Sequence, residues 1–68
     1  MILSMPDFTK PELDYIRKLA NFTEREERLF DLRSKDIPHE RCAEIMNFSL
    51  STEKRINKKM INKILKLL

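Results

Sequence analysis

The sequence predicts an all-α domain of three to four helices, with a long basic helix at its C-terminal end. The 68-residue chain contains no glycine and three prolines, all of which precede residue 39. Residues with high helix propensity, such as Leu, Lys and Glu, are abundant. No run of alternating apolar and polar residues has the length of a β-strand. We therefore expect residues 1–68 to form one helical domain.

Capping motifs mark the starts of the first two helices. Thr9 and Thr23 are each followed three residues later by a glutamate, Glu12 and Glu26. In this arrangement the threonine hydroxyl and the glutamate carboxylate satisfy free backbone N–H groups at the helix start. The two helices are expected over about residues 11–20 and 24–33. Their expected core residues are Leu13, Ile16, Ala20, Leu29 and Leu32, flanked by Leu19 and Phe30.

A tight turn is predicted between a third helix at about residues 37–46 and a fourth at about residues 50–67. Asn47 is the non-glycine type best suited to the left-handed conformation that ends a helix. Ser49 then supplies an N-cap for the next helix, and Ala43 is small enough for two helices to cross closely. This succession is typical of a helix-turn-helix, and we expect one within about residues 36–64.

The charge of the chain is concentrated in its last third. Residues 1–48 hold eight basic and ten acidic residues, a net charge of −2, whereas residues 49–68 hold six basic residues and one acid, a net charge of +5. A basic stripe on one helix is typical of polyanion binding, although a solvated helix face explains it equally well. The polar side of the last predicted helix comprises Ser51, Lys54, Arg55, Lys58, Lys59, Asn62 and Lys66. The apolar side of the helix includes Met60, Ile64 and Leu67, which fall within about 80° of Ile56, and it widens towards Ile61, Leu65 and Leu68.

Residues 22–66 resemble the helix-turn-helix of LuxR-type regulators and of sigma-factor region 4. The resemblance is carried by Phe22-Thr23-Glu24-Arg25-Glu26, Leu29, Leu32-Arg33, Cys42-Ala43-Glu44-Ile45-Met46, Asn47-Phe48-Ser49 and Ser51-Thr52. It implies sequence-specific binding to duplex DNA and a role in transcription, in a bacterium or a phage. It also implies that Ser51–Lys58 forms the recognition helix, that Arg25 lies near a phosphate, and that the last helix often mediates dimer formation.

The chain departs from the family pattern at two positions of the last helix. Glu53 stands where the family usually has an apolar β-branched residue, and Asn57 stands where it often has an apolar one. Both fall inside the expected apolar side, where an unpaired carboxylate would be costly. We therefore expect Glu53 to lie near a cation or at the edge of the protein.

The predicted DNA contacts centre on Arg55, whose guanidinium matches the O6 and N7 atoms of guanine. The full set is Arg25, Ser51, Thr52, Lys54, Arg55, Lys58, Lys59 and Asn62. Each cation has a solvent-exposed charge as its alternative, and capping alone accounts for Ser51 and Thr52 equally well. His39 is expected to be a plain surface histidine, with contact to a phosphate as the alternative.

The apolar surplus at the end of the chain predicts either a homodimer or closure within one protomer. A dimer interface would comprise Ile61, Ile64, Leu65 and Leu68, and it would supply two recognition helices for a two-fold DNA site. In the alternative, this end of the last helix packs against Leu13 and Ile16 of the first helix.

Several functional classes are not expected. No nucleophile–base pair is apparent, and one cysteine with one histidine cannot fill a zinc site, so we predict no enzyme, metal or cofactor. The start, Met1 to Pro6, lacks the features of a signal peptide, and Cys42, expected to be a small core residue, fits a reducing cytoplasm. Two rival interpretations remain: a module that binds RNA polymerase or another regulator without touching DNA, and an amphipathic helix at a membrane surface.

Overall fold

The computed structural model describes residues 8–68, and within this range the chain forms four α-helices and no strand. The helices are α1 (Lys10–Leu19), α2 (Glu24–Ser34), α3 (His39–Met46) and α4 (Leu50–Leu67). The predicted all-α class and the long last helix are confirmed. The expectation that the start of the chain, Met1 to Pro6, is not a signal peptide concerns residues that lie outside the described range. Within residues 8–68, no helix combines the length and the apolar content needed to cross a membrane.

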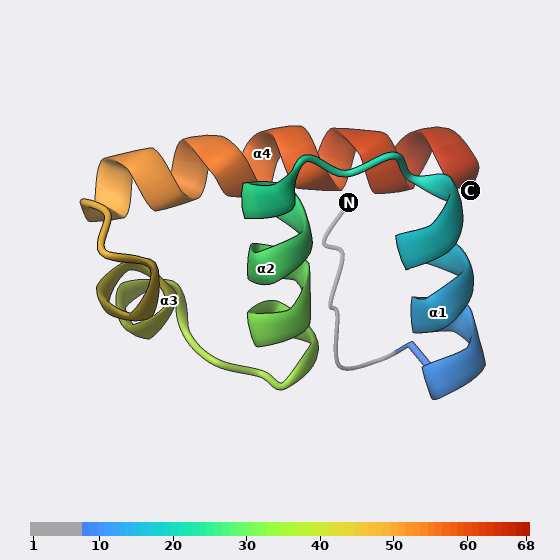
Figure 1. Ribbon diagram of the computed structural model, residues 1–68, viewed down its shortest axis with the longest axis horizontal. Coiled ribbons are helices and arrows are strands. Elements are labelled where there is room, and N and C mark those ends of the chain that lie inside the picture. The colour runs from blue at the N-terminus through green and yellow to red at the C-terminus, as the bar shows by residue number, and fades with distance from the viewer. Residues whose placement is uncertain (1–7) are drawn as a thin grey trace.

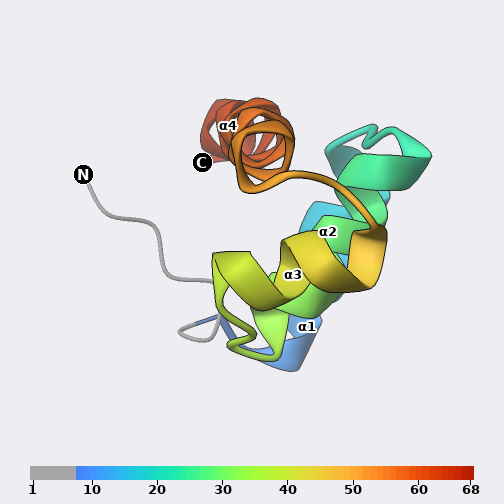
Figure 2. The same ribbon diagram turned by 90° about the vertical axis from the view of Figure 1, so that its left-hand side faces the viewer.

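The long helix α4 is the element against which the other three helices pack. It runs along one side of the molecule, above α3 at its N-terminal end, α2 at its middle and α1 at its C-terminal end (Figure 1). The view along α4 shows α1, α2 and α3 together on one side of it (Figure 2). One face of α4 is therefore buried along its length, and the opposite face is turned to solvent.

The predicted caps of the first two helices are confirmed. The Thr9 hydroxyl accepts a hydrogen bond from the backbone N–H of Glu12, whose carboxylate accepts one from the N–H of Thr9. Thr23 and Glu26 form the same reciprocal pair at the start of α2. Because these bonds satisfy N–H groups that lack helical partners, they fix where α1 and α2 begin.

The third helix begins at His39, two residues later than the sequence predicts. Asp36 takes a left-handed conformation with φ 62°, and Pro38 is extended with φ −66° and ψ 159°. Neither conformation belongs to an α-helix, so the expected start at Ile37 is wrong. The Arg33 guanidinium holds the connection in place, because its Nη1 donates to the Ile37 carbonyl oxygen at 2.6 Å.

The core lies where α4 meets the other helices, and Phe30 of α2 is at its centre. The Phe30 side chain is fully buried, and its ring centroid lies 5.2 Å from that of Phe22. This corrects the expectation that Phe30 only flanks the core beside Leu32, which is itself half-buried. The buried apolar residues are Ile16, Ala20, Leu29, Phe30, Cys42, Ala43, Met46, Met60 and Ile64.

The turn between α3 and α4 forms as the sequence predicts. Asn47 is left-handed, with φ 61° and ψ 42°. The Phe48 N–H donates to the Ala43 carbonyl oxygen at 2.9 Å, the bond that closes a Schellman motif at a helix end. Ser49 caps α4 by accepting from the Thr52 N–H at 3.2 Å, and Ala43 is buried. Only two residues, Phe48 and Ser49, therefore separate the left-handed residue from the first turn of α4.

The left-handed Asn47 gives a test of this turn. We expect Asn47→Val to lower the free energy of unfolding by about 1–2 kcal/mol, because a β-branched side chain clashes with the backbone at positive φ. Asn47→Gly is the matched control, since glycine adopts this conformation without a clash. Urea denaturation followed by circular dichroism measures both variants. Equal stability of the valine and glycine variants would contradict the role assigned to Asn47.

Candidate nucleic-acid interface

The solvent-facing side of α4 is cationic along most of the helix. All seven polar residues predicted there are exposed: Ser51, Lys54, Arg55, Lys58, Lys59, Asn62 and Lys66. At about 100° per residue they occupy an arc of about 140°. The fully buried residues of the helix, Glu53, Met60 and Ile64, lie on the opposite side. We call this set of seven residues the cationic face.

Glu53, the sole acid of α4, is turned away from the cationic face. Its side chain is 0% exposed, and its two carboxylate oxygens lie 2.8 and 2.9 Å from Nδ1 of His39 in α3. This imidazole is the hydrogen-bonding partner of the buried carboxylate, and it is a cation only when it is protonated. His39 itself is half-buried, so the prediction of a plain surface histidine is wrong.

Lys63 lies outside the cationic face and pairs with α2. Its Nζ atom lies 2.5 Å from Oε1 of Glu26 and donates to the Asn21 carbonyl oxygen at 3.1 Å. Burial raises the pKa of Glu26, but Lys63 and the hydrogen bonds from Thr23 outweigh it and hold this pKa below its ordinary value. The sequence does not predict this pair, because its two members lie 37 residues apart.

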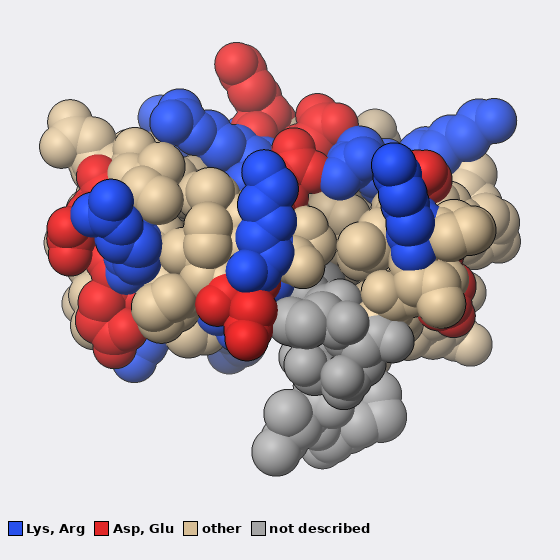
Figure 3. All heavy atoms as spheres, turned by 90° about the horizontal axis from the view of Figure 1, so that it is seen from below, with Lys and Arg blue, Asp and Glu red and all other residues tan. Residues whose placement is uncertain are grey.

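The remaining cations of α4 have no acidic partner. Lys54, Arg55, Lys58, Lys59 and Lys66 form no salt bridge with any residue in the range 8–68. Elsewhere basic and acidic side chains alternate, as on the surface facing away from α4 (Figure 3). Pairs such as Arg41 with Glu44, joined at 3.1 Å, balance the charge there. The cationic face is thus an unbalanced concentration of positive charge.

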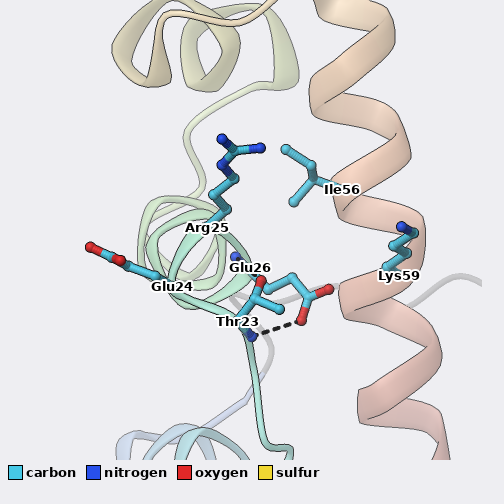
Figure 4. Close-up of a pocket in the computed structure, with 6 residues that line it drawn as sticks. All are labelled: Thr23, Glu24, Arg25, Glu26, Ile56 and Lys59. Carbon is cyan, nitrogen blue, oxygen red and sulfur yellow. Dashed lines mark hydrogen bonds between the residues drawn. The ribbon is translucent and has the colours of Figure 1, made fainter.

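A cleft between the start of α2 and the middle of α4 brings Arg25 beside the cationic face. It has a volume of about 390 Å³, and it is lined by Thr23, Glu24, Arg25, Glu26, Ile56 and Lys59 (Figure 4). Arg25 and Lys59 line it from different helices, and Glu24 points away from α4 (Figure 4). The Arg25 guanidinium also stacks over Phe48, and its Cζ atom lies 5.1 Å from the centroid of the Phe48 ring. Arg25 of α2 and Lys59 of α4 are therefore two cations on the walls of one cleft, whose lining also includes Glu24 and Glu26.

Thr52 and Asn57 are less exposed than the cationic face. The Thr52 hydroxyl accepts a hydrogen bond from the Ser49 hydroxyl at 3.0 Å. Thr52 therefore takes part in capping α4, which is the alternative to a DNA contact for this residue. Asn57, the second departure from the family pattern, is half-buried. Of the two hydroxyl residues predicted to contact DNA, Ser51 is the exposed one.

The predicted dimer interface is wrong at one of its four residues. Ile64 is fully buried in the core of the protomer, and Ile61 packs against that core. Leu65 and Leu68 are exposed, at 39% and 70%. Leu68 lines a groove together with α1 residues, including Pro11 and Tyr15. The C-terminal end of α4 therefore closes in part against α1, as in the single-protomer alternative.

The remaining candidate for reactivity, Cys42, is a core residue. Burial raises the pKa of its thiol, and the neighbouring Glu53 carboxylate raises it further, although Arg33 opposes the change. A thiol of this kind reacts slowly, because the thiolate is the nucleophile. Among residues 8–68, no three His, Cys, Asp or Glu side chains come together in a way that could hold a metal ion.

Comparison with known proteins assigns no family to the chain. No protein-family model, no curated protein and no solved structure matches it. The functional interpretation therefore depends on the residues and the geometry described above.

Proposed function

We propose that this chain is a helix-turn-helix domain that binds specific duplex DNA sequences and regulates transcription. In this proposal α3 and α4 are the two helices of the motif, and the cationic face of α4 enters the major groove. The observation that carries the proposal is the segregation of charge on α4. Five cations that form no salt bridge within residues 8–68 face solvent, and the one acid of the helix is buried.

The order of side chains across the cationic face matches the arrangement expected of a helix in the major groove of DNA. A major groove admits one α-helix, whose central side chains meet base edges while its flanks approach phosphates. On α4, Arg55 and Asn62 lie near the middle of the arc, and Lys54 and Lys59 lie on its opposite flanks. We assign base contacts to the first pair and phosphate contacts to the second.

The likeness to LuxR-type regulators and sigma-factor region 4 supports the same assignment. It implies a phosphate contact at Arg25, and that residue lines the same cleft between α2 and α4 as Lys59. A phosphate held between these two cations would extend the contact with DNA from α4 to α2. Pairing of two protomers through the exposed Leu65 and Leu68 would present two such surfaces to a two-fold site.

Arg55→Ala tests the sequence-specific part of the proposal. Selection of bound duplexes from a random DNA library is expected to yield a defined motif for the wild type. The variant should lose preference at one or two base pairs, at a cost of about 1–3 kcal/mol in binding. Lys18→Ala is the matched control, since Lys18 is an exposed cation on α1 and its loss should leave the motif unchanged.

Two outcomes would contradict the proposal. A wild type that enriches no motif would exclude a sequence-specific regulator. A wild type that binds no duplex at low salt but captures RNA polymerase would favour the protein-interaction alternative.

A further inference from the structure

We infer that the His39–Glu53 pair fixes the rotation of α4 about its own axis and so determines which side chains the cationic face presents. The pair joins the first residue of α3 to the first turns of α4. The part of this inference that concerns DNA rests on the proposed function, whereas the part that concerns the rotation of α4 stands independently.

The apolar residues of α4 leave its rotation weakly determined. They span an arc of about 180°, which is wider than one buried face requires. Met60 and Ile64 are fully buried, but Ile61 is half-buried and Leu65 is exposed. In the C-terminal half of α4, a turn of about 100° would exchange these two pairs and keep apolar side chains on the buried face. Because apolar contacts are not directional, they discriminate poorly between such rotations.

Glu53 removes this ambiguity because its contact is directional. It lies on the helix face of Met60 and Ile64, and it is as deeply buried as they are. A buried carboxylate is tolerated where it is paired and hydrogen-bonded, and leaving it unpaired is strongly destabilising. His39 Nδ1 within 2.9 Å of both oxygens supplies that partner. Rotation of α4 in either direction would separate the two groups.

Among residues 8–68, His39 is the one side chain that forms a hydrogen bond or salt bridge with the Glu53 carboxylate. Cys42, the neighbour of Glu53 on α3, has a thiol whose Sγ donates to the Ile37 carbonyl oxygen at 3.5 Å. Arg33, a cation near Cys42, donates to that same carbonyl oxygen. A single buried polar contact sets the register of some coiled coils in the same way.

The consequence for the cationic face is geometric. Glu53 lies about 160° from Arg55 around the helix, so holding Glu53 inward directs Arg55 outward. Glu53 and His39 are therefore positioning residues, which act on DNA recognition without touching DNA.

Three substitutions on the buried face of α4 distinguish a role of Glu53 in positioning the helix from a role in packing alone. Glu53→Gln keeps the shape of the side chain and an oxygen that accepts from His39. Glu53→Ala removes the contact and leaves His39, which is 30% exposed, able to bond to water. Met60→Ala is the control, since it removes an apolar side chain from the same buried face and has no polar partner.

The rotation of α4 is measured by NMR, from the contacts that the Met60 and Ile64 side chains make with Phe30. In the Met60→Ala variant, only the contact between Ile64 and Phe30 is used. We expect Glu53→Gln and Met60→Ala to keep the wild-type contacts and the wild-type DNA motif. Glu53→Ala should weaken these contacts, change the motif and lower DNA affinity by about tenfold, because misdirecting Arg55 removes a base contact. Wild-type contacts and an unchanged motif in Glu53→Ala would overturn the inference.

Two further outcomes keep the test decisive. If the wild type binds no DNA, the proposed function fails, and the NMR contacts alone decide the rotation. If Glu53→Ala does not fold, the exchanged pair His39→Glu with Glu53→His takes its place. Retention of the wild-type contacts by the exchanged pair supports the inference, and a folded protein with different contacts overturns it.

Discussion

Replacing Phe30 with alanine is expected to unfold a substantial fraction of the molecules in plain buffer. Its ring is fully buried, contacts Phe22 and lies 5.6 Å from the Arg17 guanidinium. Truncating such a residue costs about 3–5 kcal/mol, because it removes buried apolar surface and leaves a cavity. A 68-residue domain has a total stability of only about 3–10 kcal/mol. Phe30→Ala therefore removes a large share of the free energy of unfolding.

Urea denaturation followed by circular dichroism measures this loss. Tyr15→Ala is the matched control, because Tyr15 is an aromatic residue of α1 that is 58% exposed. Its truncation is expected to cost less than about 1 kcal/mol. Similar losses for the two variants would show that Phe30 does not occupy the centre of the core.

Removing three adjacent cations from α4 is expected to abolish most of the DNA affinity and leave the fold intact. Lys54, Arg55 and Lys58 are exposed, and alanine has the highest helix propensity, so the triple alanine variant should remain helical. Each lost contact with a phosphate or a base weakens binding by roughly a factor of ten, so the dissociation constant should rise by about two orders of magnitude or more.

A second triple variant distinguishes a site from an effect of overall charge. Lys10, Lys18 and Lys35 are exposed cations outside α4, and replacing them with alanine removes the same net charge. Fluorescence anisotropy with one labelled duplex compares the two proteins at equal salt. We expect the second variant to bind within about threefold of the wild type, because its charges lie away from the proposed interface. Equal losses in both variants would contradict a binding site on α4.

The features that the sequence predicts correctly depend on neighbouring residues. Thr9 and Thr23 bond to residues three positions away, and Asn47 ends α3 through its own backbone preference. The exposure of the lysines on α4 likewise follows from the period of a single helix. Such local rules need no knowledge of how the helices pack.

The features that the sequence does not predict arise from contacts between helices. The buried Glu53 contacts His39, which lies 14 residues earlier in the sequence. Lys63 pairs with Glu26, which lies 37 residues earlier. Hydrophobicity alone places Ile64 on the apolar side of α4 without showing what covers it, and the packing of the other helices buries both Met60 and Ile64 within the protomer. The sequence therefore does not separate a core position from a dimer-interface position at Ile64.

The salt dependence of DNA binding by the wild-type protein tests the central claim most directly. A protein that neutralises phosphates releases counterions, so the logarithm of its binding constant falls linearly with the logarithm of salt concentration. With phosphate contacts from Arg25, Lys54 and Lys59, we predict a slope of about −3 or steeper for duplex DNA. No binding at low salt, or binding that does not change with salt, would contradict the assignment of α4 as a DNA-binding helix.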